Sequence, residues 1–380
     1  MIPAILDKTI TDSRKRRDAS LFRVIPQKRS VEGIDLSTNS YLALHNDKRL
    51  QREAHNLTKG IYSGNLSSRL LSQSSPLYDT VENEIAEWKG CESALLFNSG
   101  YAANTGLIAA LCSRNSAIFC DRLNHASILD GCILSGARMQ RYKHNDMNDL
   151  KERLKASTGA EKLIVTDTVF SMDGDTAPLA DICQLAKEYG AAVMVDEAHA
   201  TGIFGKTASG LVEESGTEDG VHIRMGTLSK AVGGLGGFFA GPAQLRDFFV
   251  NNARSLIYST GLPQSVLAYD LCAIRFIRKN PALGKELRSE AKKFRSMLKS
   301  NGFDTMNSST QIIPLVTNSS EKALSLSAYL RDNGVFAPAI RTPTVPVGTE
   351  RIRMSLHCGI TSDEIGKVLH LITEWKKHNE

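Results

Sequence analysis

Short apolar runs recur along the middle of the chain, with space for a helix between most of them. These runs lie at residues 94–97, 117–119, 163–166, 192–195, 223–225 and 237–240. Helical spacing of apolar residues marks 76–88, 104–112, 126–135 and 179–189. The alternation predicts an α/β fold with a mainly parallel sheet and helices on both faces. Lys230 and the run at 237–240 are too close together for a helical crossover, so we expect the last strand to pair antiparallel.

The length of the chain predicts more than one domain. A chain of 380 residues can bury a sizeable core and should divide into two domains. We expect an N-terminal arm over residues 1–45, amphipathic from 4 to 22, and then a large domain over residues 46–264. A long helical pattern at 265–278 opens a smaller α+β domain over residues 265–380, with strands near 311–316 and 351–355.

Composition and charge narrow the classes of function. The net charge of +5 is mild and no basic tract is interleaved with aromatic residues, so we expect no nucleic-acid partner. No apolar segment reaches membrane-spanning length, and the first residues lack the apolar core of a secretory signal. The seven cysteines show neither CxxC nor Cys/His ligand spacing, which predicts reduced thiols, a cytoplasmic location and no metal site.

An acid, a histidine and a lysine follow two of the apolar runs. Asp196 ends the run at 192–195, His199 comes three residues later, and Lys230 follows the next run. The carboxyl ends of parallel strands meet at the edge where α/β sheets bind their ligands. Pyridoxal phosphate needs a lysine for its Schiff base and an anion against its pyridinium nitrogen. The pair of Asp196 and Lys230 therefore predicts this cofactor.

Longer motifs extend this interpretation. They are FNSGYAAN at 97–104, DRLNHAS at 121–127, FSMDGD at 170–175, DEAHATG at 196–202 and TLSK at 227–230. Over nearly its whole length the chain resembles the α-oxoamine synthases, which use pyridoxal phosphate to condense an amino acid with an acyl thioester and release carbon dioxide. The resemblance implies the fold-type I architecture of aspartate aminotransferase and a homodimer with shared active sites.

The resemblance assigns roles around the ring of the cofactor. Lys230 would hold the cofactor covalently and then act as the catalytic base and acid. Asp196 would pair with the ring nitrogen, and His125 would stack on the face of the ring. His199 and Ser171 would reach its phenolic oxygen.

The phosphate of the cofactor would be held by backbone and hydroxyl groups. The backbone amides of Gly100 and Tyr101, at the start of the predicted helix 102–112, suit a phosphate. Thr227 would supply a hydroxyl. By the same resemblance Thr260 would reach the phosphate of the neighbouring subunit.

The substrates would be held by arginines. Arg353 would bind the carboxylate of the amino acid through a bidentate fork, with Asn39 alongside. Arg23 and Arg341 would bind the far carboxylate of the acyl chain or the thioester carrier. The segments 170–179 (FSMDGDTAPL) and 339–353 (AIRTPTVPVGTERIR) resemble the branch of the family that joins L-alanine to a pimeloyl thioester in biotin synthesis. Both a coenzyme A thioester and a carrier-protein thioester stay open.

The sequence departs from the family pattern near the expected substrate cleft. Leu66 and Ser67 stand where two glycines are usual, and Gln73 stands for another glycine. Ser40 and Ala43 likewise replace an Asn or Asp and a Gly. We expect these changes to affect the preference for acyl chain and carrier.

Other functions stay open. The glycine-rich segment 233–237 also resembles relatives that use glycine, so 2-amino-3-ketobutyrate ligase, 5-aminolevulinate synthase and other glycine- or serine-using members are alternatives. An inactive partner subunit of the same fold is a further alternative, against which Lys230 argues. An aminotransferase would share the lysine and the acid but would not require the segment 339–353.

Overall fold

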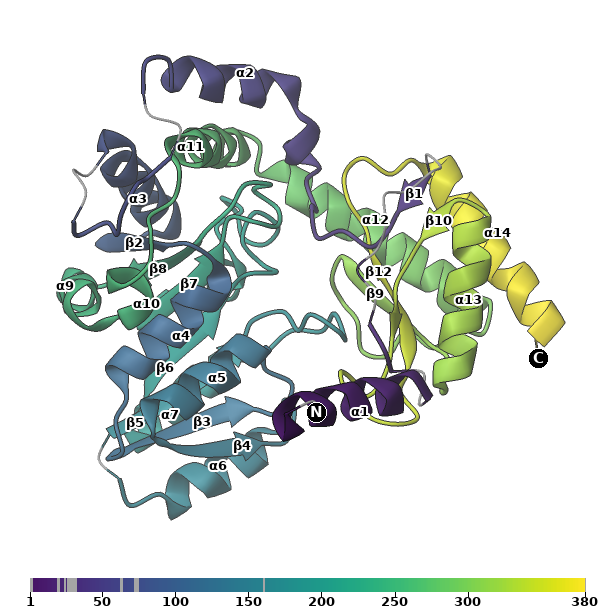
Figure 1. Ribbon diagram of the computed structural model, residues 1–380, viewed down its shortest axis with the longest axis horizontal. Coiled ribbons are helices and arrows are strands. Elements are labelled where there is room, and N and C mark those ends of the chain that lie inside the picture. The colour runs from purple at the N-terminus through teal and green to yellow at the C-terminus, as the bar shows by residue number, and fades with distance from the viewer. Residues whose placement is uncertain are drawn as a thin grey trace.

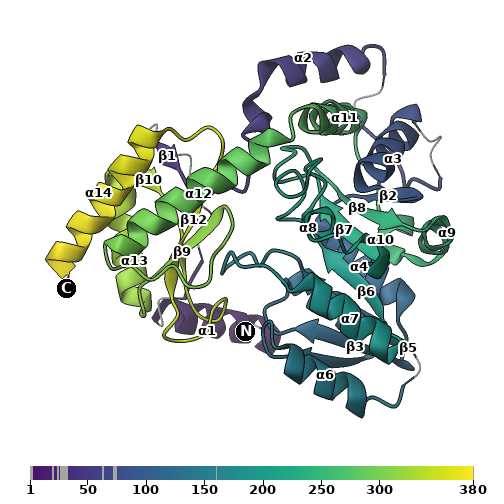
Figure 2. The same cartoon turned by 180° about the vertical axis from the view of Figure 1, so that it is seen from behind.

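A large and a small body form the molecule, and the long helix α12 runs from the large body into the small one (Figures 1 and 2). The structure is a computed structural model and describes residues 3–18, 21–23, 25, 33–61, 64–71, 75–159 and 161–379. The strands are β1 (Ile34–Asp35), β2 (Ser93–Phe97), β3 (Ser116–Asp121), β4 (Arg138–Tyr142), β5 (Glu161–Asp167), β6 (Ala192–Asp196), β7 (Ile223–Thr227), β8 (Gly237–Gly241), β9 (Ile312–Val316), β10 (Val335–Phe336), β11 (Ala339–Ile340) and β12 (Arg351–Ser355). The α-helices are α1 (Ala4–Asp18), α2 (Lys48–Leu57), α3 (Pro76–Lys89), α4 (Gly100–Leu111), α5 (Ala126–Ser135), α6 (Met147–Ala156), α7 (Leu179–Tyr189), α8 (Leu211–Ser215), α9 (Ala243–Asn252), α10 (Arg254–Ile257), α11 (Gln264–Lys279), α12 (Ala282–Ser300), α13 (Ser320–Asp332) and α14 (Ser362–Asn379).

The large body is built on a seven-stranded sheet in the order β2-β8-β7-β6-β5-β3-β4. All pairs from β4 to β7 are parallel, which confirms the predicted mainly parallel α/β sheet. Strand β8 pairs antiparallel with both β7 and β2, as the short connection after Lys230 predicted. Strand β4 was not predicted, because this edge strand is partly exposed and its sequence, RMQRY, contains no apolar run.

Alternation along the strands decides which side chains reach the site. In β6, Met194 packs in the apolar cluster that contains side chains of α4 and α5, whereas Val195 packs on the opposite face of the sheet. By this period of two, Asp196 lies on the side of α4 and α5. Strands β5 and β7 alternate in the same phase, so Asp167 and Thr227 at their ends lie on that side too.

The small body has an antiparallel sheet in the order β11-β12-β9, covered by α12, α13 and α14. A separate parallel pair joins β1 to β10, so residues 34–36 of the N-terminal segment pack with the small body. The backbone N–H of Leu36 donates to Phe336 O at 2.9 Å, and Ser355 N–H donates to Leu36 O at 2.9 Å. The domain limits at residues 45 and 264 stay a prediction.

Helix α1 forms within the predicted amphipathic arm, and all its side chains are exposed in the single chain. In both views it lies beside the ends of the two bodies (Figures 1 and 2). Within the described ranges, no helix has both the length and the apolar character needed to cross a membrane.

Candidate active site

A cavity of about 190 Å³ opens at the carboxyl ends of β5, β6 and β7, next to the first turns of α4 and α5. Seven of the predicted residues line it: Gly100, Tyr101, His125, Asp196, His199, Thr227 and Lys230. The other predicted residues lie outside this lining: Ser171, Thr260, Arg23, Asn39, Arg341 and Arg353. The predicted residues therefore form two groups, one that lines the cavity at the strand ends and one that lies outside it.

Asp196 is held rigidly at the end of β6. It is almost fully buried, its Oδ2 accepts a hydrogen bond from Nδ2 of Asn104 at 2.8 Å, and its Oδ1 accepts one from the backbone N–H of Ala198 at 2.8 Å. The Oδ1 of Asn104 is buried and has no hydrogen-bond partner among the described residues. A buried polar atom of this kind normally has a partner, so this oxygen is an unused acceptor next to the Asp196 carboxylate.

A second carboxylate, Asp167, stands beside Asp196 and was not predicted. The two residues are register partners on β5 and β6, and the Oδ2 of Asp167 accepts a hydrogen bond from the backbone N–H of His125 at 2.8 Å. Burial, and then the negative charge of Asp196, raise the pKa of Asp167 well above its usual value. The sequence contained the signal, because the run at 163–166 ends in an acid just as the run at 192–195 does.

A chain of hydrogen bonds leads from Lys230 to the small body. Lys230 Nζ lies 2.8 Å from Nε2 of His199, whose Nδ1 lies 2.6 Å from the hydroxyl of Tyr41. The hydroxyl of Tyr41 donates to Oδ1 of Asn39 at 3.2 Å, and that oxygen also accepts from a terminal nitrogen of Arg353 at 3.0 Å. The network has one consistent direction if the Lys230 ammonium donates to His199 and the His199 Nδ1–H donates to Tyr41.

Burial controls the protonation of Lys230 and His199 in this series of hydrogen bonds. Burial of its amine lowers the pKa of Lys230 to about 8, against the opposing effects of the Asp196 and Asp167 carboxylates. Burial, and then the charge of Lys230, lower the pKa of His199 well below its usual value. Near neutral pH, His199 is therefore a neutral acceptor beside a lysine that can exchange a proton.

Arg353 is a buried guanidinium whose partners are neutral. Its Nε donates to the carbonyl of Ser171 at 2.5 Å, and its terminal nitrogens donate to Oγ of Ser355 at 2.7 Å and to Asn39. Among the described residues, no carboxylate forms an ion pair with it. Its neighbour on the same strand, Arg351, is instead paired with Asp173. Because buried charges are normally paired, Arg353 is suited to bind the carboxylate of a ligand.

The first turn of α4 forms the predicted phosphate end of the cavity. The helix begins at Gly100 and not at the predicted residue 102, because Oγ of Ser99 caps it by accepting from Ala102 N–H at 3.1 Å. The first N–H groups of a helix have no partner within it. A Cβ atom at Gly100 would lie 3.2 Å from Cε of Met225, so glycine keeps this approach open. The hydroxyl of Thr227 donates to Gly236 O at 2.7 Å.

His125 lies at the rim of the cavity as the N-cap residue of α5. Its Nδ1 lies 2.7 Å from Oγ of Ser127, which also accepts a hydrogen bond from Asn104 at 2.9 Å. Burial lowers the pKa of His125, against the opposing charge of Asp196, and the ring is neutral near pH 7. Its backbone is fixed by Asp167, so the ring has a defined place beside the strand ends.

The remaining predicted residues lie at the periphery. Arg23 is exposed and donates to Oγ1 of Thr344 at 3.2 Å, and Thr344 N–H donates to Arg341 O at 3.0 Å, which brings the two predicted acyl-chain arginines to the same loop. Thr260 is exposed and forms a bridge with Ser68.

The loop with the family departures is also exposed. The side chain of Leu66 is 91% exposed in the single chain, and Ser67 accepts a hydrogen bond from Gly261 N–H at 3.0 Å. Gln73 lies outside the described residues.

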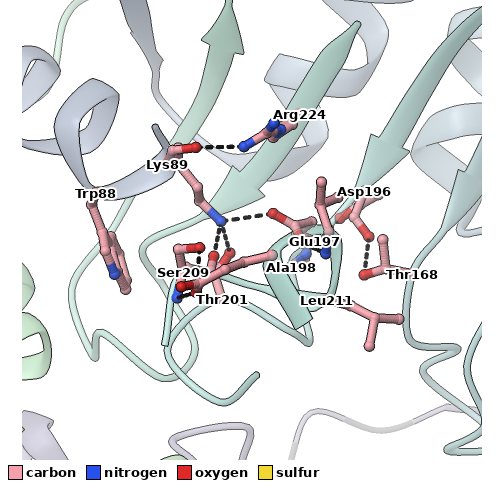
Figure 3. A network of polar contacts seen from close by, with 12 residues as sticks. Trp88, Lys89, Thr168, Asp196, Glu197, Ala198, Thr201, Ser209, Leu211 and Arg224 are labelled. Carbon is pink, nitrogen blue, oxygen red and sulfur yellow. Dashed lines mark hydrogen bonds and ion pairs between the residues drawn. The ribbon is translucent and has the colours of Figure 1, made fainter. Parts of the chain in front are cut away.

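A buried ion pair supports the turn after Asp196 from the other face of the sheet (Figure 3). Nζ of Lys89, at the end of α3, lies 2.8 Å from a carboxylate oxygen of Glu197 and donates to Oγ1 of Thr201 at 2.9 Å and to Ser209 O. The other oxygen of Glu197 accepts from the backbone N–H of Val212 at 3.0 Å. Lys89 at the end of α3 therefore holds the 196–202 turn, which carries His199, in place.

Most of the chain is similar in sequence to one family of known proteins. A family model described as aminotransferase class I and II matches residues 31–372. The 8-amino-7-oxononanoate synthase of Geobacter sulfurreducens is 44% identical over 337 residues, which cover 88% of this chain and 86% of that protein. The 8-amino-7-oxononanoate synthase of Citrifermentans bemidjiense is 46% identical over 327 residues, which cover 84% and 83%.

Solved structures agree with the fold. A high-resolution structure of SPT (serine palmitoyltransferase) with a PLP (pyridoxal phosphate) internal aldimine superimposes with a TM-score of 0.92 at 30% identity, covering 100% of this chain and 99% of that chain. The crystal structure of 8-amino-7-oxononanoate synthase from Francisella tularensis gives a TM-score of 0.78 at 25% identity, covering 91% and 98%.

Proposed function

This chain belongs to the class I and II aminotransferase family and, within it, to the α-oxoamine synthases, and we propose that it condenses L-alanine with a pimeloyl thioester to give 8-amino-7-oxononanoate, an intermediate of biotin synthesis. The reaction joins Cα of alanine to the acyl carbon and releases carbon dioxide and the carrier thiol. One observation supports this choice of substrates. Two relatives named 8-amino-7-oxononanoate synthase are 44% and 46% identical over more than four-fifths of the chain.

The cofactor is pyridoxal phosphate, which when bound withdraws electrons from Cα of the amino acid. The site fits it, because the lysine Lys230 and the acid Asp196 line one cavity together with the first turn of α4. In this proposal Asp196 pairs with the ring nitrogen, and His125 covers the ring. His199 and Ser171 lie toward its phenolic oxygen.

The phosphate in this proposal lies at the first turn of α4. The N–H groups of Gly100 and Tyr101 point their positive dipoles toward it, and Thr227 lies on the adjacent strand end. Thr260 is assigned to the phosphate of a partner subunit, since its own side chain is exposed and does not line the cavity. The proposal therefore includes a homodimer, and it includes a cytoplasmic location.

Lys230 moves the proton in this proposal. Its Nζ, with a pKa of about 8, can accept a proton from Cα of alanine and return one to the product near neutral pH. His199 is neutral and accepts a hydrogen bond from that nitrogen, which keeps the amine directed into the cavity. Tyr41 in turn fixes the tautomer of His199.

Arg353 binds the carboxylate of alanine in this proposal. It is buried, charged and surrounded by neutral acceptors, and Asn39 joins it to the chain that ends at Lys230. Arg23 and Arg341 are assigned to the far carboxylate of the pimeloyl chain or to the carrier, because the loop at Thr344 brings them together at the periphery.

The test is a substrate matrix. Purified protein would be assayed with alanine, glycine and serine against acetyl, pimeloyl and palmitoyl thioesters of coenzyme A and of a carrier protein, with products identified by mass. The expected result is the highest kcat/KM for alanine with a pimeloyl thioester. Lys230→Ala is the matched inactive control. A protein that prefers glycine with the acetyl thioester would instead belong to the ketobutyrate-ligase branch.

A serine-using synthase is the second candidate, because the backbone superimposes better on SPT than on the Francisella enzyme. The higher sequence identity to 8-amino-7-oxononanoate synthases favours alanine. In the same matrix, serine with the palmitoyl thioester would give the highest kcat/KM if this candidate were correct.

A further inference from the structure

The turn over residues 170–175, FSMDGD, contacts β12, the strand of the small body that carries Arg353. The carbonyl of Ser171 accepts from Nε of Arg353 at 2.5 Å, and the carboxylate of Asp173 pairs with Arg351. Gly174 O accepts hydrogen bonds from the backbone N–H groups of residues 309 and 310 at 2.9 and 3.2 Å. Gly174 has a φ of 70°, and a Cβ atom there would lie 2.1 Å from Ile312 O. The position of this turn therefore sets the position of both arginines.

On its other side the turn is held by His144. The Nε2 of His144 lies 2.8 Å from Oδ2 of Asp175, and its Nδ1 lies 2.9 Å from Oδ1 of Asp121 at the end of β3. The ring also packs edge-on against Phe170, with the ring centroids 4.4 Å apart. A hydrogen bond of 3.0 Å from Phe170 N–H to Asp175 O closes the turn. His144 thus contacts the first and the last residue of the turn and ties both to β3.

Both ring nitrogens of His144 face carboxylates, so both act as donors and the ring is an imidazolium. Burial opposes this charge, but the hydrogen bonds to Asp121 and Asp175 outweigh it and raise the pKa of His144 to about 10. The remaining carboxylate oxygen of Asp121 accepts from Asn145 N–H at 2.9 Å. The hydrogen bonds of His144 to Asp121 and to Asp175 are therefore both charge-assisted.

The same region also offers a group of side chains close enough to hold a metal ion, consisting of His144, Asp173 and Asp175. The guanidinium of Arg351 already pairs with Asp173, and Asp121 occupies the second nitrogen of His144. A cation beside a bound guanidinium and an imidazolium is unfavourable. The geometry favours a purely hydrogen-bonded role.

We propose that His144 is a positioning residue for amino-acid binding: it fixes the 170–175 turn in the place where the Ser171 carbonyl and the Asp173 carboxylate orient Arg353 and Arg351. The inference rests on the proposed role of Arg353 and adds a residue that touches neither substrate nor cofactor. Loss of His144 leaves Asp175 with only a neutral donor, the side-chain amide of Asn145 at 3.2 Å, so the turn is held less firmly and Arg353 loses its fixed orientation. Of the residues assigned to the cofactor only Ser171 lies on this turn, and none of the residues assigned to the acyl donor does.

The first test uses His144→Gln in the holoenzyme. Removing the two charge-assisted bonds that hold the turn next to Arg353 should raise the KM for the amino acid by about tenfold. The kcat at saturating amino acid and the KM for the acyl donor should stay within about twofold of wild type. His222→Gln is the matched control, because Nδ1 of His222 accepts from Val193 N–H at 3.2 Å at the opposite end of β6. An unchanged KM for the amino acid in His144→Gln would overturn the proposal.

The second test is a cycle with Arg353→Lys. If His144 acts through Arg353, His144→Gln should add little to the KM of an Arg353→Lys protein, whereas a general loss of structure would add in full. Should His144→Gln not fold, Asp175→Asn takes its place in both tests, because it removes the charge and keeps the shape. Full additivity would overturn the proposal.

The measurement is made with alanine, glycine and serine in parallel. If the protein uses an amino acid other than alanine, the shift appears with that one, and the failure of the proposed substrate is separate from that of the inference. If the shift is absent with all three, the role of His144 is wrong. Metal content by elemental analysis is measured on wild type and His144→Gln, and a bound metal lost only in the variant would also overturn it.

Discussion

The amine of Lys230 lies 2.8 Å from Nε2 of His199, so the two residues predicted from separate motifs meet in one hydrogen bond at the strand ends. The histidine comes from the turn after β6 and the lysine from the segment after β7. Because these strands are parallel neighbours, their carboxyl ends deliver both side chains to the same place.

The first prediction concerns the pH dependence of cofactor binding. Schiff-base formation requires the neutral amine, and burial lowers the pKa of Lys230 from 10.5 to about 8. The rate of cofactor uptake by cofactor-free protein should therefore rise with pH and level off above about 9, roughly one unit past this pKa. Stopped-flow absorbance would measure the rate. Borohydride reduction and peptide mapping should place the label on Lys230, and a label on another lysine would contradict the assignment.

The second prediction separates the effect of the Asp196 charge on turnover from its effect on alanine binding. Asp196→Asn keeps the shape of the side chain and its contact with Asn104 but removes the negative charge that favours a protonated ring nitrogen. It should lower kcat by orders of magnitude and change the dissociation constant for alanine little. Single-turnover kinetics and alanine titration would measure the two effects. Near-normal turnover would mean that Asp196 is only structural.

The third prediction concerns Arg353. Arg353→Lys keeps a charge but loses the planar fork, so binding of the alanine carboxylate should weaken by ~1.5–3 kcal/mol. The KM for alanine should rise accordingly, while the KM for the acyl donor should not. Arg23→Ala and Arg341→Ala are expected to show the opposite pattern in the same steady-state assay. A variant of Arg353 that weakened both substrates equally would argue against this assignment.

The fourth prediction concerns the buried ion pair below the site. Lys89→Met leaves the carboxylate of Glu197 buried without its cation, which should cost about 3–5 kcal/mol in the free energy of unfolding. Lys89→Met combined with Glu197→Gln should recover part of this loss, because no uncompensated charge remains. Urea denaturation measures both. Equal stabilities for the single and double variants would contradict the cost assigned to the uncompensated charge of Glu197.

The sequence was sufficient for six of the seven strands of the large sheet and for most of the residues at their ends. Apolar runs that end in polar residues locate β5, β6 and β7, and parallel pairing brings their ends together. The same pattern contained Asp167, which was overlooked because its run ends in a single acid without a motif of its own. The start of α4 was displaced because Gly100 is a weak helix former and Ser99 is the true cap.

The contacts between the bodies could not be predicted. The Tyr41 hydroxyl meets His199 across 158 residues, and Arg351 meets Asp173 across 178. No local pattern carries such a pairing, because it depends on how β12 packs against a distant turn. His144 also has no local signal, since a histidine in a polar segment is common on protein surfaces.

Asp196 and Glu197 differ by one methylene group, yet successive side chains at the end of β6 point in opposite directions. Asp196 faces the cavity and Asn104, whereas Glu197 faces Lys89 on the other side of the sheet. Selection on turnover therefore acts most directly at position 196 and selection on stability at position 197, which reaches the site only through the turn that carries His199. In a directed-evolution library, variation at 197 would tune robustness, while variation at 196 would sample reactivity.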